Sequence, residues 1–268
     1  MRLTIRHELR TELAEAAETS VHYLRLTPRR DHGQKVLDWR VRCTGGRLTP
    51  WVDGFGNQCH VFWQDRAADE LVLVAEGEIE TETGTGGSGT QSDISDLMFL
   101  RPTDLTRGGK ALDAFVEPAA RVRAEASAAD ALNVLLELVH ALPVGQPPED
   151  APRGVDTWLD AIPDAAARTH VFIAAAHRLG VPARFVSGYV WRQRKGRDVL
   201  DAHSWAEAMI EDQGWVGFDV EAARSATAAY VRLAIGFDAE SAAAIVSSRK
   251  TANRSAIAAR LVQPAAQQ

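Results

Sequence analysis

Cysteine is scarce in this sequence. Its 268 residues include only Cys43 and Cys59, which form no C-x-x-C pair and have only His60 nearby as a further ligand type. This argues against a disulfide framework and against a zinc site, so no metal and no cofactor is expected. We interpret both residues as structural thiols, because free cysteines are commonly buried.

Long apolar runs and blocks of like charge are also missing. No window approaches the run of about 18 apolar residues that a membrane span needs, and residues 1–7 are charged where a signal peptide is apolar. The 30 basic and 36 acidic residues give a net charge of −6 and are dispersed along the chain. We therefore expect a cytoplasmic protein that binds neither nucleic acid nor a membrane.

Strand signals follow one another quickly in residues 1–82. Apolar and polar residues alternate over 3–7 and again over 37–41, which is the period of a sheet with one buried face. The segment 53–57 reads DGFGN, which is typical of a hairpin turn, and 71–80 reads as a further strand. These short strands predict a small antiparallel β-sandwich.

A glycine-rich segment lies between the two predicted domains. Residues 84–89 read GTGGSG, a run with almost nothing to bury, so we place a flexible linker at 83–93. A core domain is then predicted over 94–249. The remaining tail, 250–268, mixes alanine, glutamine and scattered charge, which fits a short helix or disorder equally well.

The first part of this core is predicted to be helical. Pro118 can occupy the first turn of a helix whose apolar residues recur at spacings of three and four as far as Val139, and Pro143 ends it. Residues 147–152 form a rigid proline-rich loop, and Trp158 is expected in a short helix.

A further helix is expected to begin after Asp164, whose carboxylate can cap the free N–H groups of the first turn, and to stop at Gly180. Strands are predicted over 182–191, 202–210 and 214–219. A buried helix followed by antiparallel strands that carry a histidine and an aspartate is the element order of papain-like cysteine chemistry.

The motifs within these elements resemble the bacterial transglutaminase-like superfamily. They are HVFIAAAHRLGVPARFVSGY at 170–189, HSWAE at 203–207 and GWVGFD at 214–219, while LRLTP at 24–28 and the turn at 53–57 resemble the β-sandwich that precedes this core in many bacterial members. The resemblance implies an α+β fold: an N-terminal antiparallel β-sandwich followed by a papain-like, transglutaminase-like core with helices packed on an antiparallel sheet.

The same resemblance implies a lost nucleophile. In the family a Gly-x-Cys-x-Asp segment opens the helix, and alignment on His170 puts Ala165 at the cysteine and Ala167 at the aspartate. The family's Asp-Pro-Thr-Asn after the last strand is Asp219 to Ala222 here. A laboratory Cys→Ala change would leave its neighbours alone, so several replacements together indicate a natural loss.

The three triad positions imply different roles. The helix start would lower the pKa of a cysteine, His203 would take and return its proton, and Asp219 would hold the imidazole in the useful tautomer. Removing the nucleophile of such a unit commonly costs about a millionfold in rate. The alanine at position 165 is therefore stronger evidence against catalysis than the surviving histidine and aspartate are for it.

Two nearby hydroxyls are poor replacements for the thiol. Ser204 adjoins His203 on a strand and should face the opposite side. Thr169 follows Ala165 by one helical turn, about 6 Å deeper, which is too far for a carbonyl docked at the helix start.

Three further groups of residues are open to two interpretations. Trp205 and Trp215 are candidates for lining a substrate groove and are equally good core residues. His170 and His177 lie about 10 Å apart on one helix face, which is too far for one metal ion and favours packing. Asp164 is a candidate binding residue at the helix start that can instead be occupied as the cap.

The leading hypothesis is a pseudoenzyme whose cleft binds or scaffolds a peptide or protein. A helix start facing a histidine that Asp219 helps to keep protonated favours an anion such as a peptide carboxylate. The resemblance also suggests ATP-grasp-like or helical companion proteins as partners.

Two other hypotheses compete with it. The chain could be an amide or peptide hydrolase, or an acyl transferase, that uses His203 and Asp219 on a water molecule without a cysteine. Alternatively the pair is inherited packing, and function rests on the β-sandwich or on oligomerisation.

Overall fold

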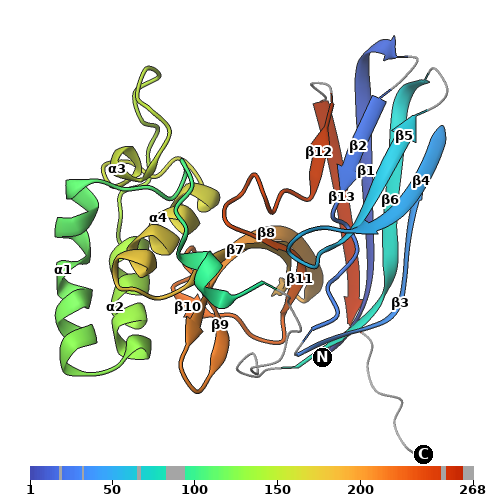
Figure 1. Ribbon diagram of the computed structural model, residues 1–268. Coiled ribbons are helices and arrows are strands. Elements are labelled where there is room, and N and C mark those ends of the chain that lie inside the picture. The colour runs from blue at the N-terminus through green and yellow to red at the C-terminus, as the bar shows by residue number, and fades with distance from the viewer. Residues whose placement is uncertain (18–19, 32, 65–67, 83–93, 249–251, 262–268) are drawn as a thin grey trace, which may run out of the picture.

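The computed structural model describes residues 1–17, 20–31, 33–64, 68–82, 94–248 and 252–261. Figure 1 shows three parts side by side: a group of helices, a central antiparallel sheet and a β-sandwich. This is the predicted α+β architecture. None of the helices in the described ranges is long and apolar enough to cross a membrane.

Two four-stranded antiparallel sheets form the sandwich. The alternation at the N-terminus is confirmed, because Leu3 and Ile5 are buried and their neighbours are exposed. Leu24 and Phe62 of one sheet pack between the sheets against Leu73 of the other. The strands from this half are β1 (Arg2–Ala17), β2 (Ser20–Leu24), β3 (Gln34–Cys43), β4 (Gly46–Val52), β5 (Gln58–Gln64) and β6 (Ala68–Thr81).

The C-terminal part of the chain returns to the sandwich, which the sequence analysis did not predict. Strand β12 (Ile245–Ser247) pairs with β2, and β13 (Ala252–Leu261) pairs with β1 over ten residues from Leu3↔Leu261 to Glu12↔Ala252. The expectation of a short helix or disorder is therefore wrong for 252–261. The edge of β1 supplies the backbone partners that a weakly patterned segment such as ANRSAIAARL does not specify by itself. Figure 1 shows β13 lying against β1.

The predicted linker at 83–93 lies outside the described residues. After it come the short 3₁₀ helix η1 (Asp96–Leu100) and two helices, α1 (Lys110–Glu125) and α2 (Ala128–His140). The prediction of one helix from Pro118 to Val139 is wrong. Pro118 lies inside α1, and Ser127 breaks the run because its hydroxyl caps α2 by accepting the N–H of Asp130 at 3.1 Å.

The core is built around α4 (Ala165–Arg178), which follows the short helix α3 (Val155–Trp158). Asp164 caps α4 as predicted, since its carboxylate accepts the N–H of Ala167 at 2.7 Å. Behind α4 lies a five-stranded antiparallel sheet of order β10-β9-β8-β7-β11. Its strands are β7 (Ala183–Arg194), β8 (Arg197–Ile210), β9 (Gly214–Asp219), β10 (Arg224–Ser225) and β11 (Tyr230–Gly236).

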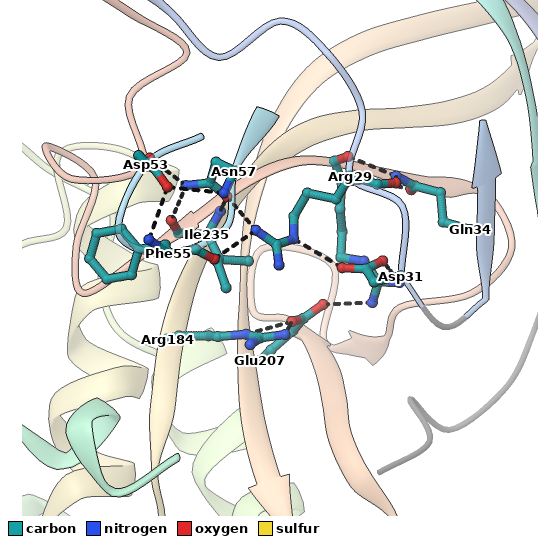
Figure 2. Close-up of polar contacts among 10 residues, drawn as sticks. Arg29, Asp31, Gln34, Asp53, Phe55, Asn57, Arg184, Glu207 and Ile235 are labelled. Atoms are coloured by element: carbon teal, nitrogen blue, oxygen red, sulfur yellow. Dashed lines mark hydrogen bonds and ion pairs between the residues drawn. The ribbon is translucent and has the colours of Figure 1, made fainter. Parts of the chain in front are cut away.

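The sandwich packs directly onto this sheet. Leu3 and Ile5 of β1 join one apolar cluster with Tyr189 of β7 and Val231 of β11. The predicted turn at 53–57 is confirmed and also reaches the core: the Asn57 side chain both donates to and accepts from the backbone of Ile235, at 2.9 Å each (Figure 2). The two halves are therefore joined by apolar burial and by specific hydrogen bonds.

Candidate functional site

His203 and Asp219 lie together on neighbouring strands, as the sequence predicts. The Nε2 atom of His203 on β8 is 2.9 Å from Oδ2 of Asp219 at the end of β9, and their side chains are 5% and 0% exposed. The strand register pairs Ala206 with Phe218, so residues 203 and 219 share one face of the sheet. The pair is formed and enclosed by protein.

Asp219 is held by three donors. Its Oδ2 atom accepts from His203 and, at 2.5 Å, from the hydroxyl of Tyr230, and Oδ1 accepts the N–H of Ala222 at 3.1 Å. Burial alone would raise the pKa of this carboxyl, but the hydrogen bonds from His203 and Tyr230 outweigh it and bring the pKa below its usual range. Asp219 is therefore ionised at neutral pH, and the imidazole donates its Nε2 proton to it.

The other imidazole nitrogen faces a second carboxylate. Nδ1 of His203 is 3.6 Å from Oε2 of Glu221, whose side chain is 54% exposed. Glu221 also interacts electrostatically with Arg168 of α4, a buried guanidinium that donates to the carbonyls of Val139 and Leu142.

Ala165 opens α4 and offers no reactive atom. Its carbonyl accepts the Thr169 hydroxyl at 2.9 Å. Phe172, seven residues later on the same helix face, packs on Phe218 of β9 with ring centroids 5.1 Å apart. The face of α4 that bears Ala165 is therefore turned toward the strand that carries Asp219, while its place as the counterpart of a nucleophile stays a prediction.

Other nucleophilic groups lie elsewhere. Ala206, two residues after Ser204 on β8, packs in the helix-side cluster, so Ser204 faces the side opposite to His203. Cys43 and Cys59 are free and lie in the sandwich strands β3 and β5, where burial raises the pKa of each to about 12. No hydroxyl or thiol among the described residues hydrogen-bonds His203.

The two candidate groove tryptophans are core residues in this structure. Trp205 is 1% and Trp215 is 6% exposed, and both belong to an aromatic cluster with Phe99 and Tyr230. Their edges reach a pocket of only about 50 Å³. A ligand role for either stays a prediction, and packing accounts for both.

Gly188 shows how closely the structure is built around His203. The two residues are opposite each other in the β7–β8 pair. A Cβ atom at position 188 would lie 2.0 Å from the carbonyl oxygen of Val231 and 2.8 Å from the Trp205 ring. Glycine is therefore needed for β11 and Trp205 to close in beside the imidazole.

A buried ion network lies on the same sheet face. Glu207 is 2% exposed and binds Arg184 at 2.7 Å and Arg232 at 3.1 Å. Arg232 in turn binds Asp31 of the sandwich at 2.8 Å, and Arg184 stacks on Trp215 with 3.9 Å to the ring centroid. Figure 2 shows this group joined to the 53–57 turn through Arg29.

Burial would raise the pKa of Glu207, but Arg184 and Arg232 outweigh it and lower that pKa to about 2. The carboxylate is therefore ionised under all ordinary conditions, with both oxygens occupied by guanidinium groups. This network has a structural role that ties the sandwich to the core sheet.

Sequence reasoning missed two residues of this site and one residue of the adjacent ion network. Tyr230 and Glu221 come from β11 and from the turn after β9, so only the strand pairing brings them to Asp219 and His203. Glu207 could have been placed, because the period of two in His203-x-Trp205-x-Glu207 puts all three on one face.

Comparisons with known proteins fit this architecture. Residues 3–80 match the family described as the bacterial transglutaminase-like N-terminal region, and residues 141–220 match the transglutaminase-like superfamily. The two segments together span more than half of the chain. No curated protein matches it.

One solved structure shares the fold over nearly the whole length. It is a protein from Cytophaga hutchinsonii described as a "putative cysteine protease", with a TM-score of 0.74 and 16% sequence identity, covering 98% of this chain and 91% of that one. At this sequence identity the likeness shows a common fold and does not show a common activity.

Proposed function

We propose that this protein, which carries both matched regions of the transglutaminase-like superfamily, is a catalytically inactive member that binds a peptide or a protein partner. The observation that carries the proposal is a formed His203–Asp219 pair with alanine at position 165 and no thiol or hydroxyl bonded to the imidazole among the described residues. A histidine and an aspartate can move a proton, but covalent acyl transfer needs an atom that attacks the carbonyl.

Glu221 supports a binding role and refines it. Its carboxylate stands 3.6 Å from Nδ1 of His203, in the place where an incoming anion would pair with the imidazole. Because Glu221 is half exposed, it can swing away at little cost, and a peptide carboxylate can replace it. A bound partner therefore competes with a carboxylate of the chain itself.

The first experiment asks whether position 165 faces the imidazole. Ala165→Cys should react with iodoacetamide at pH 7 at least tenfold faster than Ala166→Cys, since His203 withdraws the thiol proton only at position 165. Cys43 and Cys59 give a low background because burial raises the pKa of each to about 12. Adding His203→Ala should remove the excess rate, and equal rates at 165 and 166 would contradict the assignment of Ala165.

The second experiment measures binding. Calorimetry with a set of short peptides bearing free C-termini should give heat that is lost in His203→Ala and strengthened in Glu221→Gln. Glu211→Gln, an exposed residue in the β8–β9 turn, is the matched control and should change nothing. Equal affinity in Glu221→Gln and His203→Ala would eliminate the carboxylate version of the proposal.

A second candidate function is amide or peptide hydrolysis, or acyl transfer, without a cysteine. The observation that favours it is the 3.6 Å gap between Nδ1 and Glu221, because these two bases could flank and deprotonate a water molecule. A peptidase and amidase assay on the purified chain separates the two functions. Turnover that disappears in His203→Ala would replace the pseudoenzyme proposal.

A further inference from the structure

One outer face of the β-sandwich carries large aromatic side chains in contact with solvent. In the sheet of order β12-β2-β5-β4, Leu24 and Phe62 point between the two sheets, so their neighbours Tyr23 and Trp63 point outward. Trp63 is 54% exposed, Tyr23 is 44% exposed and Trp51 of β4 is 41% exposed. We call the surface formed by these three residues the aromatic face. Exposed apolar surface gathered in this way marks a contact with another molecule.

The other outer face of the same sandwich has the composition of a surface in contact with water. On the sheet of order β13-β1-β6-β3, ion pairs join Arg2 to Glu78 and Arg6 to Glu76. A sandwich needs only the inner face of each sheet to be apolar, and its outer faces are normally polar. The aromatic face is therefore not required by the sandwich itself.

Large and small side chains alternate across the aromatic face. Strand pairing puts Tyr23 between Val246 and Val61 in one row across the sheet, and Val21 beside Trp63 in another. Each large ring thus stands next to a shorter side chain. Two copies related by a two-fold axis bring the same patch together, so the rings of one copy can pack over the valines of the other.

The charge of the aromatic face also suits a second copy. Among the described outward-facing residues of β2, β4, β5 and β12, Arg47 is the only arginine, lysine or carboxylate. The whole chain carries a net charge of −6, so its copies repel one another over much of their surface. Two copies therefore meet with least repulsion at this nearly uncharged patch.

The size of the face sets the strength of such a contact. The strands β4 and β5 have seven residues each, β2 has five and β12 has three. At a rise of about 3.3 Å per residue and a strand spacing of about 4.8 Å, the sheet covers roughly 350 Å². Stable dimers bury about 1,600 Å² in total, or about 800 Å² per partner, so this face supports a weak dimer and not an obligate one.

We propose that the aromatic face binds the same face of a second copy of this chain, in a symmetric dimer that forms at high protein concentration. Figure 1 shows β2, β4 and β5 on the side of the molecule away from the helices, so the dimer leaves the His203 site open. The proposal does not depend on any role of His203 or Glu221.

Sedimentation equilibrium of the full chain, from about 5 µM to about 1 mM, measures the association, and we expect a dissociation constant on the order of 100 µM. Raising the salt concentration should not weaken the dimer, because the contact is apolar. Weakening by salt would indicate a contact through the charged face and would overturn the proposal.

Variants on the two outer faces locate the contact. Trp63→Arg removes a ring and sets like charges against each other, so it should weaken the dimer at least tenfold. Trp63→Thr keeps a residue suited to a strand and should also weaken it. Thr4→Arg adds the same charge on the exposed face of β1 and is the matched control, which should leave the dimer unchanged. Circular dichroism checks that each variant is folded.

Three results would contradict the proposal. A chain that stays monomeric at the highest concentration would show that a second copy does not cover the aromatic face. Equal weakening by Thr4→Arg and Trp63→Arg would place the contact elsewhere. Assembly beyond the dimer would exclude a closed two-fold arrangement.

Discussion

Glu207 and Asp219 are two buried carboxylates on one face of the same sheet, and they differ in how their partners are enclosed. Glu207 lies between Arg184, which is 2% exposed, and Arg232, whose side chain is 16% exposed. Asp219 binds His203, whose far nitrogen faces the half-exposed Glu221. The first network ends inside the protein, and the second ends at a group that can move.

This difference separates a structural network from a candidate site. Fully paired charges in a dry environment fix a geometry and leave nothing for a ligand to bind. A pair in which one imidazole nitrogen faces a movable, half-exposed side chain can still bind a ligand or transfer a proton.

The largest effect is expected for Glu207→Gln. It leaves the buried guanidinium of Arg184 without its anion and removes one of the two carboxylates that bind Arg232, and the free energy of unfolding should fall by about 3–5 kcal/mol. Urea unfolding followed by circular dichroism measures it. Glu8→Gln, which removes a carboxylate from an exposed arginine pair, should leave the urea midpoint close to that of the parent chain. A small loss for Glu207→Gln would mean that water enters the network.

Acid should destabilise the chain in two stages. Burial lowers the pKa of His7 and of His170 from 6.5 to about 4, so between these values only the unfolded chain takes up protons and stability falls as the pH drops. Below about 4.5 the unfolded form of Glu207 is protonated while the folded form stays ionised down to about 2, which lowers stability further.

Unfolding midpoints in urea from pH 7 to pH 3 measure both stages. The second stage should be shallower in Glu207→Gln than in the parent chain, since that variant has no carboxyl to protonate at this position. A midpoint that stays constant between pH 7 and pH 4.5 would contradict the role of the buried histidines.

Asp219→Asn should have a smaller effect on stability, about 1–3 kcal/mol, because it removes the charged acceptor of His203 and Tyr230 but keeps the shape. Its distinctive result concerns the imidazole: ¹⁵N spectra should show loss of the Nε2–H tautomer of His203. Tyr230→Phe removes only one of the donors to Asp219 and should preserve that tautomer. An unchanged tautomer in Asp219→Asn would show that the aspartate does not orient the ring.

Glu221→Gln should have the smallest effect on stability, within about 0.5 kcal/mol, because exposed ion pairs contribute little. Urea unfolding compared with Glu211→Gln measures the difference. A loss as large as that of Asp219→Asn would show that Glu221 closes the network and that the contrast with Glu207 does not hold.

Sequence patterns predicted much of this fold because the patterns are local. The alternation of Leu3 and Ile5, the glycines of the 53–57 turn and the Asp164 cap each act within a few residues. The helix over Pro118–Val139 was predicted wrongly because apolar spacing continues across the break that Ser127 introduces. Strand β13 was missed because its stability comes from β1, some 250 residues away.

In the candidate site, the residues that belong to a local motif were predictable and the others were not. His203 and Asp219 follow from the HSWAE and GWVGFD motifs, and their 2.9 Å contact follows once the strands pair. Tyr230, Glu221 and Arg168 carry no motif of their own. Their proximity depends on register and on the twist of neighbouring strands, which a single sequence does not encode in readable form.

By itself, the sequence determined which chemical groups the protein has: a histidine and an aspartate in two strand motifs, an alanine at position 165, and two cysteines in the first 60 residues. Tertiary structure alone decided which of these groups meet. It placed Glu221 against the imidazole and enclosed Glu207 between two guanidinium groups. The physical reason is that composition and period act over a few residues, whereas a contact between distant side chains exists only after strands have paired and helices have packed.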